Sequence, residues 1–122
     1  MDKKFYITTP IYYPSAKPHM GHAYSSIIAD FFARFKRMDG FDVQFLTGTD
    51  EHGLKIQRSA EKQNIDPLEF CNQISQTFRD LSKTLNLTNT DFIRTTEERH
   101  KKTVQHLWNE LEKNDDIYLS KY

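Results

Sequence analysis

The chain has 122 residues, and its 17 Lys and Arg balance 17 Asp and Glu, so the formal net charge is zero. This balance excludes a basic nucleic-acid-binding surface spread over the whole chain, and the length allows one domain at most. The single cysteine, Cys71, excludes an intrachain disulfide and a CxxC zinc pair, and we expect it in the core. No window approaches the ~20 apolar residues of a membrane span, so we expect a cytoplasmic protein without membrane contacts.

A strand and a long helix are predicted first. Residues 5–9 are aromatic and β-branched, which is typical of a buried strand. Pro18 suits the first turn of the following helix, and Gly40 suits the left-handed residue that ends it. Large apolar residues of this helix recur at helical spacing, namely Tyr24, Ile27, Ile28, Phe31, Phe35 and Met38.

The next elements predict a parallel sheet. Residues 41–48 have the composition of a second strand, and the order strand, helix, strand indicates a right-handed crossover. Residues 54–62 favour a short helix. A further helix should begin after Asp66, with Asp66 as its cap and Glu69 completing a capping box. This helix carries an apolar stripe that we expect in the core, formed by Cys71, Ile74, Phe78, Leu81 and Leu85.

The last third of the chain is less regular. Residues 92–93 are either a short strand or an irregular segment, and residues 117–122 again have strand-forming side chains. Thr95 and Glu98 have capping-box spacing at the start of a last helix. Its expected inner face consists of His100, Val104, Leu107, Trp108 and Leu111.

A candidate site lies where the first strand meets the first helix. His19 and His22 are three residues apart, so they share one face of the first helical turn. Free N–H groups at a helix start bind anions, and imidazole N–H groups could stabilise charge developing on a phosphate. By spacing alone, the two could equally be ordinary half-exposed histidines. Asp50 follows the second strand, and we expect it at the same sheet edge as the imidazoles.

Three motifs in order resemble one family. The run His19-Met20-Gly21-His22 resembles the HIGH signature of class I aminoacyl-tRNA synthetases, and residues 7–14 resemble the preceding run in methionyl-tRNA synthetases. Residues 48–53 (GTDEHG) and 91–96 (DFIRTT) are similar to later elements of that family. The resemblance covers essentially the whole chain. Met20 stands where Ile or Leu is usual, and Ser15-Ala16 where Asn is common.

This resemblance implies an α/β fold, the first half of a doubly wound, Rossmann-like parallel sheet with flanking helices, truncated at the start of the connective insertion. Residues 1–116 would then be the N-terminal half of the catalytic domain, and residues 117–122 the beginning of the insertion. The second half, with its KMSKS loop, and the anticodon-reading domain would lie elsewhere, so we expect the 122-residue chain alone to be inactive. Whether the complete protein binds zinc stays open.

The resemblance also implies a reaction. ATP, with Mg²⁺, would activate methionine to methionyl-adenylate, and the acyl group would pass to tRNA(Met), bound mostly outside this chain. His19 and His22 would be catalytic and, with Gly21, would bind ATP. Asp50 would bind the methionine ammonium group. The apolar wall around the thioether would come from Pro10, Ile11 and Tyr13, with His52 in the layer behind and no metal-binding residues.

Other functions stay open on the sequence. A small stand-alone nucleotidylyltransferase shares the strand-to-helix HxGH joint, although it does not explain residues 10–13 or 48–53. A non-catalytic binding module or a split remnant is the third possibility. Asp50 could also be a turn-forming carboxylate, and Tyr13 an ordinary core residue.

Overall fold

The computed structural model describes residues 3–121. Three parallel strands, β1 (Lys4–Thr8), β2 (Asp42–Thr49) and β3 (Asp91–Arg94), form one sheet in the order β1-β2-β3. Helix α1 (Met20–Met38) connects β1 to β2, and α2 (Leu54–Gln63) and α3 (Pro67–Thr84) connect β2 to β3, with α4 (Glu98–Lys113) last. The predicted parallel α/β arrangement is confirmed, and residues 92–93 belong to a strand.

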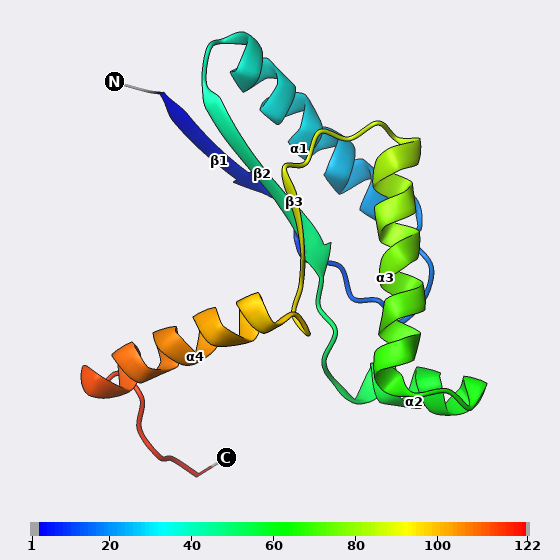
Figure 1. The fold of residues 1–122 in the computed structure, drawn as a ribbon, viewed down its shortest axis with the longest axis vertical. Coiled ribbons are helices and arrows are strands. Elements are labelled where there is room, and N and C mark those ends of the chain that lie inside the picture. Colours follow the sequence, from blue (N-terminus) through cyan, green and yellow to red (C-terminus); the bar gives the residue numbers. More distant parts are fainter. Residues whose placement is uncertain (1–2, 122) are drawn as a thin grey trace.

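The helices α1 and α3 lie on the same side of the sheet (Figure 1). On this side Phe5 and Ile7 of β1 and Phe45 of β2 pack against the small residues Ala29 and Ala33 of α1. The opposite face is open among the described residues, and Tyr6 there is 64% exposed. The prediction of a buried first strand was therefore wrong in one respect, because β1 is buried on one face only.

Helix α1 packs through its small residues. Ala23, Ala29 and Ala33 are buried, and their short side chains allow the helix to lie close to the sheet. Gly40, with a φ of 80°, follows the helix in the left-handed conformation that was predicted. The large apolar residues lie on the outer side, where Tyr24, Ile27, Ile28, Phe31, Phe32, Phe35 and Met38 are all exposed.

Helix α3 forms a second core with α2, and most of its prediction is confirmed. Asp66 caps the helix, because its side chain accepts hydrogen bonds from the N–H groups of Leu68 and Glu69. The predicted capping box is not formed, since the Glu69 carboxylate accepts from Asn72 and Gln73 instead. From the predicted stripe Cys71 and Phe78 are buried, whereas Ile74, Leu81 and Leu85 are half-buried.

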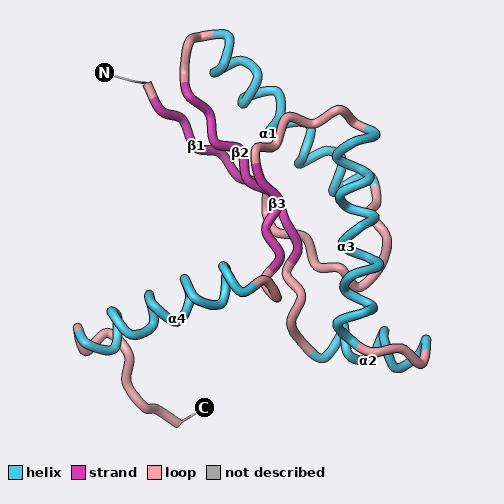
Figure 2. The backbone as a smooth tube through the Cα atoms, viewed as in Figure 1, coloured by secondary structure: helices cyan, strands magenta, loops and turns pink. Residues whose placement is uncertain are grey.

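Helix α4 projects away from the sheet (Figure 2), and none of its residues is buried. The predicted inner face was wrong: Leu107 and Trp108 are more than half exposed. The predicted Thr95 cap was also wrong, because Glu97 precedes the helix and the Thr95 hydroxyl accepts a hydrogen bond from Glu51 N–H. Residues 117–121 form no strand, and Tyr122 lies outside the described residues. Within residues 3–121 no helix combines the length and apolarity needed to cross a bilayer.

Candidate functional site

The joint between β1 and α1 is closed by a cap made of two histidines. His19 is the N-cap of α1, so the helix begins at Met20 rather than at Pro18 as predicted. The Nδ1 atom of His19 accepts a hydrogen bond from Gly21 N–H at 3.0 Å, and Nδ1 of His22 accepts one from His19 N–H at 3.0 Å. The two side chains therefore form a reciprocal capping box.

This cap determines where the imidazole protons lie. A ring nitrogen that accepts a hydrogen bond carries no proton, so the donor of each ring is Nε2–H. The ring centroids are 3.8 Å apart. Burial and, to a smaller extent, the neighbouring His19 ring lower the pKa of His22 below its ordinary value of 6.5. The pair thus offers two Nε2–H donors.

Gly21 provides the space for this arrangement. A Cβ atom at Gly21 would lie 2.9 Å from Cε1 of His19, closer than such contacts allow. The cap also engages backbone donors, because Gly21 N–H binds His19 Nδ1 and His22 N–H binds the His19 carbonyl at 3.0 Å. The sequence predicted free N–H groups here for an anion. The N–H groups of Gly21 and His22 are hydrogen-bonded within the cap, so the imidazole side chains become the main donors for an anion.

Both imidazoles line a hollow of about 350 Å³. Lys17 and Lys55 also line it, and among the described residues no carboxylate does. Lys55 was not predicted, although one signal was available, since a cation in the first turn of α2 opposes the helix dipole. The lining residues are Tyr13, Ser15, Ala16, Lys17, His19, His22 and Lys55. Such a set suits a polyanion.

Two tyrosines tie this hollow to the rest of the fold. Tyr12 is buried, and its hydroxyl donates to the His22 carbonyl at 3.2 Å while its ring lies edge-on to the His22 ring at 4.8 Å. Tyr13 packs against the core of α2 and α3, and its Oη lies 2.6 Å from where a Cβ on Gly53 would be. The other two predicted wall residues, Pro10 and Ile11, are exposed and do not line the hollow.

Asp50 lies at the same end of the sheet as the histidines. Its N–H donates to the Tyr12 carbonyl at 2.9 Å, and Tyr12 N–H donates to the Gly48 carbonyl at 2.9 Å, which extends the pairing of β1 with β2. Tyr12 therefore contacts both Asp50 and His22. Asp50 is half-buried and is not among the residues that line the hollow. His52 is exposed, with Nε2 3.3 Å from the Thr95 carbonyl oxygen.

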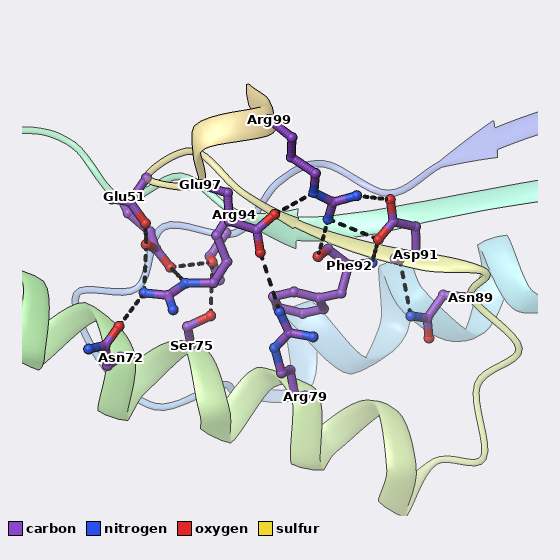
Figure 3. A network of polar contacts seen from close by, with 12 residues as sticks. Glu51, Asn72, Ser75, Arg79, Asn89, Asp91, Phe92, Arg94, Glu97 and Arg99 are labelled. Atoms are coloured by element: carbon purple, nitrogen blue, oxygen red, sulfur yellow. Dashed lines mark hydrogen bonds and ion pairs between the residues drawn. The ribbon is translucent and has the colours of Figure 1, made fainter. Parts of the chain in front are cut away.

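Between Asp50 and His52, the Glu51 side chain is fully buried in a polar network that was not predicted from the sequence (Figure 3). Its carboxylate accepts hydrogen bonds from Arg94 Nε at 2.8 Å and Nη2 at 3.0 Å, and from the Thr96 hydroxyl at 2.5 Å. Burial raises the pKa of Glu51, but the hydrogen bonds from Arg94, Thr96 and Thr49 outweigh it and lower the pKa overall. Glu51 therefore links the motif at residues 48–53 with the motif at residues 91–96.

Comparison with known proteins identifies the family. A family model described as tRNA synthetases class I (M) matches residues 5–122. The chain belongs to this family. The methionine–tRNA ligase of Bacillus subtilis is 54% identical over 118 residues, which are 97% of this chain and 18% of that protein. The mitochondrial methionine–tRNA ligase of Takifugu rubripes is 53% identical over 121 residues, or 99% of this chain and 20% of that protein.

Solved structures agree with this class I synthetase (M) assignment. The Mycobacterium tuberculosis methionyl-tRNA synthetase in complex with methionyl-adenylate matches with a TM-score of 0.95 and 44% identity, over 98% of this chain and 24% of that chain. The predicted family and fold class are confirmed. The chain spans about a fifth of the length of its curated relatives. The roles of the individual site residues and the domain boundary at residue 116 stay predictions.

Proposed function

We propose that this chain contributes to the methionine-activating site of a methionine–tRNA ligase. In this reaction the carboxylate of methionine attacks the α-phosphorus of ATP, pyrophosphate leaves, and methionyl-adenylate forms. The acyl group then passes to the 3′ end of tRNA(Met). The observation that carries the proposal is the reciprocal histidine cap, which leaves the Nε2 atoms of two imidazoles as donors at a hollow whose described lining residues include no carboxylate.

The capped histidines would act on the phosphates. Nε2–H donors of His19 and His22 would bind the α-phosphate as negative charge develops on its oxygens, and because the cap already holds the rings, little reorganisation is needed during reaction. Gly21 would let the nucleotide approach the backbone. Lys17 and Lys55, which line the same hollow, would bind the outer phosphates as point charges. Mg²⁺ would enter with ATP as a counter-ion of its phosphates.

The methionine side would be formed by Asp50 and by apolar residues after β1. The Asp50 carboxylate would accept the ammonium group of the amino acid. The thioether would contact an apolar wall formed by Pro10, Ile11 and Tyr13, with His52 behind it. Discrimination against shorter side chains would stay modest, because a missing methylene is worth only about 1–3 kcal/mol. Binding of tRNA(Met) would rely mainly on parts of the complete protein beyond these residues.

The direct test is ATP–pyrophosphate exchange by the complete gene product with each amino acid in turn. We expect methionine alone to support exchange, followed by acylation of tRNA(Met) but of no other tRNA. Pyrophosphate exchange with a different amino acid would contradict the proposal that methionine is the substrate. Transfer of a nucleotide to a small phosphorylated acceptor, without an amino acid, would favour a nucleotidylyltransferase instead.

A further inference from the structure

Glu51 is held on all sides, although it lies in a loop. Its two carboxylate oxygens accept four hydrogen bonds, from Thr49 Oγ1, from Arg94 Nε and Nη2, and from Thr96 Oγ1. Its N–H donates to Thr95 Oγ1 at 2.8 Å, and its carbonyl accepts from the Cys71 thiol, with the sulfur 3.8 Å away. The side chain, the N–H and the carbonyl of Glu51 are thus all hydrogen-bonded. These bonds hold the backbone at this position of the loop.

The two residues that flank Glu51 in the sequence are accessible to solvent. The Glu51 side chain is 0% exposed, whereas Asp50 is half-buried and His52 is exposed. The Asp50 N–H is bound to the Tyr12 carbonyl, and the His52 ring lies near the Thr95 carbonyl. The backbone of Asp50 is therefore held on one side by the pairing with Tyr12 and on the other by the anchored Glu51.

Three elements meet at this carboxylate, which Figure 3 shows together. Arg94 ends β3, and its Nη2 also donates to Asn72 of α3 at 2.7 Å. The Thr49 hydroxyl, at the end of β2, lies 3.1 Å from the Ser75 hydroxyl of α3. A buried ion pair often contributes little net stability compared with apolar packing, so the hypothesis we pursue is that this network fixes one conformation of the loop.

We propose that Glu51, held by Arg94 and Thr96, is a positioning residue that aims the Asp50 carboxylate at the ammonium group of the amino acid substrate. This inference rests on the proposed function, in which Asp50 binds that group. Glu51 itself does not touch the substrate. Its removal should therefore weaken recognition of the amino acid and leave recognition of ATP at the histidine cap unchanged.

The test uses Glu51→Gln in the complete enzyme, because Gln has the same shape but loses one acceptor and the charge. We expect the KM for methionine in pyrophosphate exchange to rise about tenfold or more, which corresponds to about 1.4 kcal/mol, while the KM for ATP stays unchanged. Thr96→Val removes one hydrogen bond with little change of shape, and should raise the methionine KM by a smaller factor. If the Glu51→Gln variant does not fold, the methionine KM of the Thr96→Val variant tests the inference instead.

The matched control is Asp91→Asn, at the other end of β3. It removes an ion pair with Arg99 that is about half exposed on both sides, with Oδ2 2.6 Å from Nη1. We expect both KM values of this variant to equal those of the wild type. A purely structural role for Glu51 would lower the amount of active enzyme, and hence the apparent kcat, without changing the methionine KM, and that result would overturn the inference.

A double-mutant cycle with Asp50→Asn separates the inference from the proposed function. If Glu51 acts through Asp50, the double variant should have no higher methionine KM than Asp50→Asn alone. Independent effects that multiply would overturn the positioning role and leave the proposed function intact. An unchanged methionine KM in Asp50→Asn itself would instead contradict the role of Asp50, and the Glu51 inference with it.

Discussion

His22 is the better held of the two capping histidines. Its ring contacts the rings of Tyr12 and Phe78 edge-on, at centroid distances of 4.8 and 5.1 Å, whereas His19 is exposed. We expect His22→Ala in the complete enzyme to slow adenylate formation by about 10²–10³-fold, or roughly 2.7–4 kcal/mol, as for other donors to a developing charge. Single-turnover kinetics would measure it. His106→Ala, on the exposed helix α4, is the control, and an unchanged rate for His22→Ala would contradict the catalytic role.

His22 also predicts a pH dependence of stability. Its pKa is lowered in the folded chain, so below about pH 6.5 the unfolded chain binds more protons. The free energy of unfolding should therefore rise with pH up to about 6.5. The contribution of His22 is lost as pH falls through its lowered pKa, because the charged ring is partly buried and lies beside His19. Urea unfolding between about pH 5 and pH 7.5 would show it. His22→Ala should flatten the dependence, and His106→Ala should keep it.

At the residue scale the sequence predicted contacts within a motif better than contacts between motifs. The spacing of His19 and His22 was sufficient to place both at one helix start. Glu51 and Arg94 are 43 positions apart, and only the register of β2 and β3 brings them together. Nothing local to either residue indicates the pairing. Lys55 was missed although its place in the first turn of α2 was a local signal, because the hollow that it lines is formed by two segments distant in sequence.

At the element scale the caps make measurable predictions. Asp66 accepts from two N–H groups at the start of α3, so Asp66→Ala should lower the free energy of unfolding by about 0.5–2 kcal/mol. Asp80→Ala is the control on the same helix. Its ion pair with Lys83 is 3.8 Å long and largely exposed, and its loss should cost little. Equal effects of the two substitutions in denaturant unfolding would contradict the role of the cap.

Hydrophobic periodicity predicted the helices but not the faces that they bury. In α1 the sheet contacts small residues, because Ala29 and Ala33 allow close packing, and the large apolar residues lie outside. In α4 a regular apolar face is present, yet no residue of the helix is buried. The spacing of apolar residues identifies a helix from its own sequence. Which face is buried depends on what packs against it, which is information from outside the helix.

At the scale of the whole molecule, the described residues fall into a packed part and a projecting part. The sheet with α1, α2 and α3 contains all three apolar clusters of buried residues. Helix α4 is attached near its start, where Arg99 binds Asp91, Glu97 and the Phe92 carbonyl (Figure 3). These contacts hold only the first turn, so the remaining turns depend on their own helical propensity.

This division predicts uneven protection from hydrogen exchange in the 122-residue chain. Most of the stability of a helix in a protein comes from packing of its apolar face, and α4 has 16 residues without a buried side chain. We expect its amides after the first turn to exchange far faster than those of α1 and α3 at the same pH and temperature. Arg99→Gln should extend fast exchange into the first turn of α4 and leave α1 unchanged. If the amides of α4 were protected from hydrogen exchange as strongly as those of α3, this prediction would be wrong. Contacts other than those described here would then have to stabilise α4.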